Sequence, residues 1–354
     1  MIDKEVGYIA LSRFSRTSAK EVRDAIADFV FEERHRQQRS RIDVECKPDQ
    51  FKVKLTGTDA DQYTEKDKLL SARMYKAITI ILFKLEGQKL LRRPEFGMAD
   101  RLLLDRINFE SKTIDIGGNI YSLEDCDFPT IDPADPYTLT PEELHVIEQL
   151  TDSFRHSEKL QTHVRFLYSK GGLYKVHNGN LLFHGCIPMT EEGQLQSFTI
   201  GGKERKGKEF LDYADQTARK AYYAQRGTPE REFGMDFLWW LWAGRNSPIF
   251  GRDRMATFER RFIDDEVAQA EPKNAYYTYY QDPAVCDMLL KEFGLTAYCL
   301  TGNYNYPSPT LTGSVLDDIV FVDEIIGEDK VTQLKLRNKK TDEISTLDVN
   351  GAFI

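Results

Sequence analysis

The spacing of apolar and polar residues along the chain predicts several helices. From Lys66 onward, apolar residues recur at the three- and four-residue spacing of one helical face. They are Leu70, Met74, Ile78, Ile81, Leu82 and Leu85. We predict a helix over 66–91, with Gly87 as a residue that can end it.

Two further helices are indicated by start signals and apolar stripes. Thr140 suits a capping position, Pro141 suits the first helical position, and Glu143 completes a capping box. The stripe that follows consists of Leu144, Ile147, Leu150 and Phe154. These features predict a helix over 140–158, and the segment KGKEFLDYADQTARKAYYAQ predicts another over 208–225.

Short strands are predicted between and after these helices. HVRFLYSK, LYKV and NLLFHG are separated by Gly-Gly and Asn-Gly turns, which are strong hairpin signals. We therefore predict a meander, and a sheet around residues 109–184. VGYIALS, FKVKLTG, DIVFVDEIIG and KVTQLKLRN also have the pattern of strands. The expected fold class is α/β (or α+β), with flanking helices and β-rich ends.

The composition fits a globular protein and narrows its partners. The chain has 354 residues, 41% of them hydrophobic, and 48 Lys+Arg stand against 57 Asp+Glu. This acidic balance disfavours nucleic acid. The apolar run FLWWLWAG is too short to cross a bilayer, so we expect no membrane partner. The five cysteines form no CxxC pair and the first residues form no signal peptide, so we expect a cytoplasmic protein.

The segment GGKERKGKEF partly matches a phosphate-binding loop. Gly202, Gly207 and Lys208 satisfy the G-x-x-x-x-G-K spacing. The next residue is Glu209, where the motif requires a magnesium-binding Ser or Thr. A carboxylate there would repel phosphates, so we interpret the segment as a solvated turn between a strand and a helix.

Four histidines fall close together in the sequence, and one of them is a candidate for chemistry. His156, His163 and His177 lack the spacing of a zinc helix and are interpreted as surface or packed residues. His184 differs because it ends the apolar strand LLF and precedes Gly-Cys-Ile-Pro. Functional side chains are often placed where a strand ends and turns. A packed core histidine is the alternative.

A second candidate site is the loop within WAGRNSPIFGRDRMATFERRF, at 242–262. The guanidinium groups of Arg245, Arg252 and Arg254 suit phosphate oxygens, which they can bind through two parallel hydrogen bonds. Irregular backbone leaves N–H groups for the same ligand. The alternative, which charge alone favours, is an exposed loop with ordinary surface arginines.

Several long phrases of the chain are distinctive: KAITIILFKLEGQKLLRRPEFGMADRLLLDRI, FPTIDPADPYTLTPEE, HSEKLQTHVRFLYSKGGLYKVHNGNLLFHGCIPM and NSPIFGRDRMATFERRFI. Together they resemble class III fructose-1,6-bisphosphatase, the large bacterial type. The resemblance runs in order from about Leu69 to about Leu295. It implies metal-dependent hydrolysis of the 1-phosphate of fructose 1,6-bisphosphate, a step of gluconeogenesis, on a partial metallophosphoesterase-like sheet.

The resemblance also implies roles for individual residues. FHGCIP corresponds to a strand-end histidine of calcineurin-like metallophosphoesterases, so His184 would bind one metal of a two-metal centre containing Mn²⁺ or Mg²⁺. The implied contacts to the sugar bisphosphate are Arg245, Ser247, Arg252 and Arg254. The family's D-x-H, G-D-x-x-D-R-G and G-N-H-[DE] phrases do not occur in this chain. Asn303 stands where the family has a second histidine and is a weaker candidate ligand.

Two functions therefore stay open. The first is the phosphatase, and the second is a non-catalytic sugar-phosphate-binding or assembly relative, which the missing ligand phrases suggest. A sheet that lacked its first half would expose apolar strand edges. We therefore expect either a homo-oligomer or a rebuilt sheet in which the two end segments supply the missing strands.

The two ends of the chain resemble other proteins. Residues 5–26 are similar to a strand-helix phrase of carboxyl-terminal processing peptidases, and the last 35 residues to a strand pair of thioredoxin-reductase-like flavoproteins. A redox or peptidase module is thus a third hypothesis. We predict three parts: a strand-helix extension at 1–65, the phosphatase-like region at 66–300 and a β-rich extension at 301–354.

Overall fold

The computed structural model describes residues 64–177, 180–295, 298–299, 311–312, 320–326, 332–338 and 342–348. The predicted strands VGYIALS and FKVKLTG lie outside these residues, as does Asn303. The chain divides into two compact units. The first comprises Met1–Gly172, Ser197–Arg205 and Asp212–Lys273, and the second comprises Leu173–Gln196, Lys206–Leu211 and Asn274–Ile354. The three predicted parts, 1–65, 66–300 and 301–354, stay a prediction.

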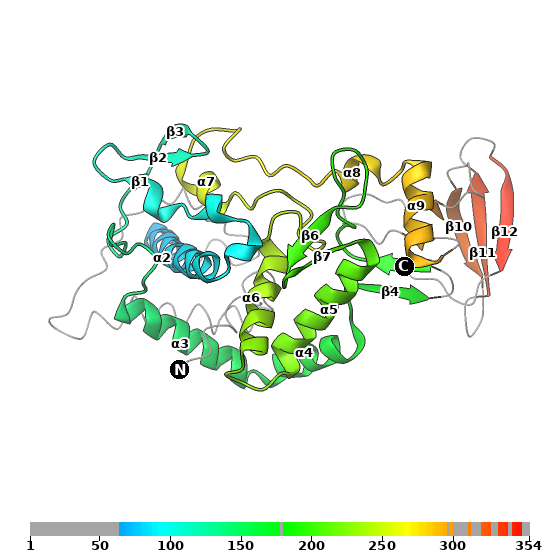
Figure 1. The fold of residues 1–354 in the computed structure, drawn as a ribbon, viewed down its shortest axis with the longest axis horizontal. Coiled ribbons are helices and arrows are strands. Elements are labelled where there is room, and N and C mark those ends of the chain that lie inside the picture. The colour runs from blue at the N-terminus through cyan, green and yellow to red at the C-terminus, as the bar shows by residue number, and fades with distance from the viewer. Residues whose placement is uncertain are drawn as a thin grey trace. The chain divides into compact units, whose positions relative to one another are not determined.

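The first unit is built around one long helix, α2 (Glu65–Arg92), which lies between a small antiparallel sheet and a second helix (Figure 1). The sheet has the order β1 (Ile107–Asn108), β2 (Thr113–Ile116) and β3 (Asn119–Ser122), and the second helix is α3 (Pro141–His156). The remaining elements are η4 (Pro94–Phe96), η5 (Ala99–Arg101), η6 (Leu104–Arg106), α4 (Glu158–Lys170), β6 (Ser197–Ile200), β7 (Lys203–Lys206), α6 (Pro229–Ala243) and α7 (Thr257–Phe262). Helix α5 (Gly207–Tyr223) belongs partly to each unit.

Helix α2 is buried on more than one side, and its charged residues are matched by buried partners. The side chains of Lys76 and Lys84 are both fully buried. Lys76 Nζ lies 2.7 Å from the carboxylate of Asp125, and Lys84 Nζ lies 2.8 Å from that of Glu143 in α3. A buried cation is tolerated when a carboxylate of this kind neutralises it. These pairs therefore fix how α2 sits against the loop after β3 and against α3.

Gly87 does not end α2, because the helix continues to Arg92. Gly87 is buried, and a Cβ atom at this position would lie 2.0 Å from a ring carbon of Tyr137. The glycine therefore permits close packing of Tyr137 on the helix. The prediction that it terminates the helix is wrong.

Three predicted helices are confirmed as α2, α3 and α5. Helix α3 begins with the predicted capping box: Thr140 Oγ1 accepts a hydrogen bond from Glu143 N–H at 3.2 Å, and the Glu143 carboxylate accepts one from Thr140 N–H at 2.9 Å. Glu143 thus caps α3 and binds Lys84 of α2.

The segment HVRFLYSK is helical, so its predicted strand is wrong. It belongs to α4, which Ser157 caps by accepting a hydrogen bond from Leu160 N–H at 3.4 Å. Tyr168 of α4 stacks on Tyr222 of α5 with ring centroids 4.4 Å apart. The predicted sheet around residues 109–184 is not a single sheet: β1, β2 and β3 form one sheet, and the strands after α3 and α4 form another.

The second unit begins with the hairpin of β4 (Tyr174–His177) and β5 (Asn180–Phe183). Its other elements are α8 (Tyr276–Tyr279), α9 (Pro283–Phe293), β8 (Tyr298–Cys299), β9 (Leu311–Thr312), β10 (Val320–Ile326), β11 (Gln333–Asn338) and β12 (Ile344–Asp348). Leu181, Ile187 and Leu289 are among the most deeply buried residues of its core. The predicted strands DIVFVDEIIG and KVTQLKLRN are confirmed as β10 and β11, which pair antiparallel.

The described residues thus form a mixed α/β structure of helices and small antiparallel sheets, which confirms the predicted fold class. Within them, no helix has the length and apolar character that a membrane span requires.

Candidate functional site

The candidate phosphate-binding arginines lie on the arginine loop, residues 244–256, which follows α6 in the first unit. Asn246 N–H donates to the carbonyl oxygen of Arg252 at 2.7 Å and closes the loop on itself. Asn246 has φ +54° and Gly251 has φ +61°, so both adopt the left-handed backbone that Asn and Gly tolerate best. The sequence is therefore suited to a fixed, tightly turned loop.

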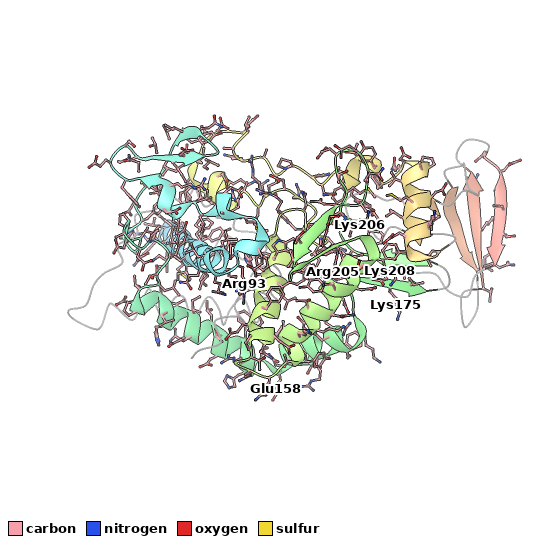
Figure 2. The ribbon with its side chains drawn as sticks, viewed as in Figure 1. Arg93, Glu158, Lys175, Arg205, Lys206 and Lys208 are labelled. Carbon is pink, nitrogen blue, oxygen red and sulfur yellow. The ribbon has the colours of Figure 1, made fainter. Side chains whose placement is uncertain are left out.

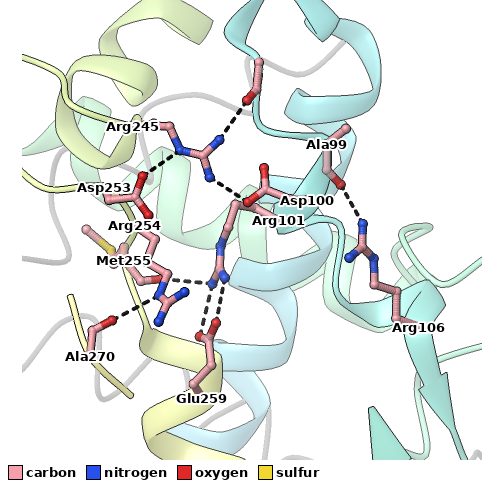
Figure 3. Close-up of polar contacts among 11 residues, drawn as sticks. Ala99, Asp100, Arg101, Arg106, Arg245, Asp253, Arg254, Met255, Glu259 and Ala270 are labelled. Carbon is pink, nitrogen blue, oxygen red and sulfur yellow. Dashed lines mark hydrogen bonds and ion pairs between the residues drawn. The ribbon is translucent and has the colours of Figure 1, made fainter. Parts of the chain in front are cut away.

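Arg245 is held by two carboxylates and one carbonyl (Figure 3). Its Nη2 lies 2.6 Å from Asp100, its Nε 3.0 Å from Asp253, and its Nη1 donates to the carbonyl oxygen of Gly97 at 3.2 Å. Burial lowers the pKa of Arg245, but the two carboxylates more than offset this and raise it. In this arrangement Arg245 ties the arginine loop to the segment around η5.

Arg252 and Arg254 are bound mainly by backbone carbonyls. Arg252 Nη1 donates to the carbonyl of Glu271 at 3.0 Å, and its nearest contact to a carboxylate oxygen of that residue is 3.9 Å. Arg254 donates to the carbonyls of Ala270 and Val267 at 3.0 and 2.9 Å. Among the described residues, no carboxylate forms an ion pair with Arg254. A guanidinium group has five N–H donors, so Arg254 keeps both charge and donors for an anion.

Ser247 is fully buried and is used inside the loop. Its hydroxyl donates to the carbonyl of Leu241 and accepts a hydrogen bond from Phe250 N–H at 3.1 Å. The side chain therefore holds the loop against the end of α6. A contact with substrate would require these bonds to open, and the predicted substrate role of Ser247 stays a prediction.

Two buried ionic clusters near the loop were missed by the sequence reasoning. In the first, Arg101 of η5 binds Glu259 of α7 through two hydrogen bonds of 2.6 and 3.0 Å, and Glu86 of α2 faces the same guanidinium. In the second, Asp236 of α6 is buried among cations at the end of α2, and Arg93 Nε lies 2.8 Å from its carboxylate. Figure 2 labels Arg93, which directly follows α2. The sequence signal that could have indicated these clusters is the presence of charged residues among the apolar residues of α2 and α6.

His184 lies in the second unit, directly after β5, and its side chain is exposed. It is therefore not a packed core histidine. Gly185, with φ +97°, turns the chain away immediately afterwards. Cys186 is buried, and burial raises the pKa of its thiol to about 12. This thiol stays protonated at neutral pH, so the reactive thiolate and ligand form is absent there.

The described residues do not fit a two-metal centre by themselves. Such a centre needs several His, Asp or Glu side chains converging on one point. Within the part of the chain that the structure describes, no group of three or more His, Cys, Asp or Glu residues has the arrangement of a metal site. The ligand roles of His184 and Asn303 stay predictions.

The segment GGKERKGKEF forms a turn between a strand and a helix, which confirms the prediction that it is not a phosphate-binding loop. Gly202 lies in the turn between β6 and β7, and Gly207 begins α5. The N–H of Lys208, at the start of α5, donates at 2.9 Å to the carboxylate of Glu292. An acidic side chain thus occupies the helix N-terminus that a phosphate would need.

Comparisons with known proteins show which family the sequence is similar to. The family model described as Firmicute fructose-1,6-bisphosphatase matches residues 40–302. A fructose-1,6-bisphosphatase class 3 of Clostridium novyi is 50% identical over 238 residues, which are 67% of this chain and 36% of the relative. One from Clostridium tetani is 51% identical over 231 residues, which are 65% of this chain and 35% of the relative. No solved structure matches.

The chain is therefore related to sugar-bisphosphate phosphatases in sequence. It belongs to the Firmicute fructose-1,6-bisphosphatase family, whose curated relatives carry the class 3 name. It spans only about a third of the length of these relatives.

Proposed function

We propose that the protein takes part in the metal-dependent hydrolysis of the 1-phosphate of fructose 1,6-bisphosphate, a step of carbohydrate metabolism and gluconeogenesis in the cytoplasm. One observation carries the proposal: half of the residues are identical over 238 positions to a protein named for this activity. The arginine loop falls inside the matched range, so its phosphate-binding chemistry belongs to the shared region.

In this proposal the arginine loop recognises a phosphate of the sugar bisphosphate. Arg254 is the leading residue, because its partners are neutral carbonyls and a phosphate would add charge-assisted hydrogen bonds to them. Arg252 lies on the same loop and is also bound to a carbonyl. Arg245 and Ser247 give the loop its shape, and Arg245 reaches a ligand only by exchanging a carboxylate partner for it.

Mn²⁺ or Mg²⁺ is the proposed ion, with His184 and Asn303 as ligands. Because the described residues do not complete a metal site, no step of hydrolysis is assigned to them. The exposed side chain of His184 is free of core packing and accessible to further ligands. The other ligands must come from outside the described residues, and a homo-oligomer is one arrangement that would supply them.

A second candidate function is a non-catalytic sugar-phosphate-binding or assembly protein. It is favoured by the lack of a three-residue metal cluster among the described residues. It predicts that fructose 1,6-bisphosphate binds without added metal and is released unchanged.

The test is phosphate release from fructose 1,6-bisphosphate by the purified full chain, with and without Mn²⁺. The proposal predicts release that depends on Mn²⁺ and stops when the metal is chelated. A folded sample that binds the sugar bisphosphate but releases no phosphate would instead support the second candidate.

The variant His184→Ala tests the ligand role of that residue. If His184 binds metal, the variant loses most Mn²⁺-dependent release, whereas His163→Ala, at an exposed position of α4, retains it. Equal activity of the parent and His184→Ala would remove His184 from the metal site, whatever the activity of the chain.

A further inference from the structure

A small, partly open cavity lies within the first unit, where α2, η5, η6, α6 and α7 meet. It has a volume of about 40 Å³ and is lined largely by apolar side chains, among them Phe83, Leu90 and Phe258. Two charged side chains also line it, Glu86 and Arg101. An apolar cavity wall with two opposite charges is an unusual place for an ionisable carboxyl group, because burial disfavours its charged form.

The positive charge of Arg101 acts on two carboxyl groups, those of Glu259 and Glu86. It binds both carboxylate oxygens of Glu259, which is fully buried, at 2.6 and 3.0 Å, so that pair is neutral. Glu86 of α2 lines the same cavity, and the charge of Arg101 lowers the pKa of Glu86. When both glutamates are ionised, one cation is set against two anions, and these three residues carry one excess negative charge.

Other groups around Glu86 offset this excess only in part. Lys89, one turn further along α2, lowers the pKa of Glu86, but it also contacts Asp236 at 3.1 Å. Trp239 of α6 lines the same cavity, and its indole has no charge. Tyr137 lines the cavity, but its hydroxyl donates to Asp105 at 3.0 Å.

The balance of these effects leaves Glu86 able to change its charge near neutral pH. Burial raises the pKa of Glu86 to about 7, although Arg101 and the Trp239 indole both lower it. The adjacent Glu259 adds to the increase in pKa. Protonation from solvent water is sufficient for the change, and no other reactant is needed.

The cluster is connected to the arginine loop by two contacts (Figure 3). Arg101 Nη2 donates to the carbonyl oxygen of Met255, near the end of the loop, at 3.1 Å. The neighbouring residue Asp100 holds Arg245, at the start of the loop, at 2.6 Å. Any shift of Arg101 therefore acts on both ends of the loop.

We propose that Glu86, Arg101 and Glu259 form a proton-linked latch that positions the arginine loop. With Glu86 protonated, Arg101 is committed to Glu259 and to the Met255 carbonyl, and the loop is held. With Glu86 ionised, its charge draws Arg101 away from these partners, and the loop is held less tightly. The consequence for phosphate binding rests on the proposed function, but the latch itself does not.

The test measures amide hydrogen exchange of the 244–256 segment in the ligand-free chain, corrected for the intrinsic effect of pH. In the parent protein, protection is expected to fall by about threefold or more between pH 6 and pH 8.5. In Glu86→Gln, which keeps the neutral form, protection should stay at the level of the parent at pH 6. The control Glu232→Gln, at an exposed position of α6, should behave like the parent.

A spectroscopic titration checks the same charge change without relying on the loop. The fluorescence of Trp239 should titrate with a midpoint near 7 in the parent, and the transition should disappear in both Glu86→Gln and Trp239→Phe. Loop protection that is independent of pH in the parent, or that has the same pH dependence in Glu86→Gln, would overturn the latch. Because no substrate or metal is present, this result would leave the proposed function untouched.

Discussion

Asp236 is a single buried carboxylate shared by three cations. Lys89 Nζ, Arg92 Nη2 and Arg93 Nε lie 3.1, 2.5 and 2.8 Å from its oxygens. Burial raises the pKa of Asp236, but the hydrogen bonds and charges of Arg92, Lys89 and Arg93 outweigh it, so the pKa falls below its ordinary value of 3.8. The carboxylate thus joins the end of α2 to α6.

Asp236→Asn should destabilise the protein strongly at neutral pH. Breaking a buried charge pair by removing one partner costs about 3–5 kcal/mol, because the remaining charges lose their compensation. Since the pKa is lowered in the folded state, this stabilisation is present above pH 3.8 and is lost as pH falls through the folded-state pKa. Urea unfolding of parent and variant at pH 7 and in steps below pH 3.8 measures the difference, and an effect that does not shrink as pH falls would contradict the assignment.

Ionisation of Glu86 should lower the stability of the folded protein, whereas ionisation of Asp236 raises it. The pKa of Glu86 is raised from 4.5 to about 7, so the folded protein binds an extra proton between these values and loses stability as pH rises through them. The shift corresponds to at most about 3 kcal/mol. Glu86→Gln should therefore be more stable than the parent at pH 8, with the advantage shrinking towards pH 5. Thermal unfolding across this range measures it, and a constant difference would count against the raised pKa.

At the scale of elements, α2 shows where a glycine is needed for packing. Replacing a glycine by alanine at an exposed position inside a helix usually stabilises the helix by up to about 1 kcal/mol. In Gly87→Ala the new Cβ would lie 2.0 Å from the ring of Tyr137, so overpacking is expected to destabilise the protein by about 1–3 kcal/mol. Chemical unfolding tests this, with the exposed Ser71→Ala as control. A stabilised Gly87→Ala protein would show that the contact with Tyr137 is not formed.

Local signals were sufficient to predict some elements and insufficient for others. The capping box at Thr140 and the pairing of β4 with β5 depend on residues close in sequence, and both were predicted. HVRFLYSK has aromatic and β-branched residues typical of strands, but a helical face of this segment meets α5 through the Tyr168–Tyr222 stack. That partner is distant in sequence, so tertiary contact decided the structure where propensity was ambiguous.

The partners of buried charges were also beyond sequence reasoning. Lys84 pairs with a carboxylate 59 positions away, and Lys89 with one 147 positions away. Apolar periodicity predicts that a helix is buried, but it does not show which carboxylate meets which lysine. For the same reason the arginine loop could be predicted as a phosphate-binding candidate, whereas its link to Glu86, Arg101 and Glu259 could not.

For the whole molecule, sequence similarity shows the family, and the structure shows where the candidate site residues lie. The family is established by a match over residues 40–302. The described residues contribute an exposed strand-end histidine and an arginine loop, which Arg245 fixes through ion pairs with Asp253 inside the loop and Asp100 outside it. Because the chain spans about a third of its relatives' length, phosphate recognition is the part of the proposed chemistry that these residues can test alone.

The most direct test is the equilibrium affinity of the chain for fructose 1,6-bisphosphate, measured calorimetrically in the presence of a chelator for the parent and Arg254→Met. Losing a charge-assisted contact should weaken binding by about 10- to 100-fold. Arg106→Met is the matched control, because Arg106 also donates to a carbonyl, that of Ala99, but lies outside the loop. Weakened binding in Arg254→Met alone would support phosphate recognition by the arginine loop. Equal affinity of folded parent and Arg254→Met, or no binding by the parent, would contradict it.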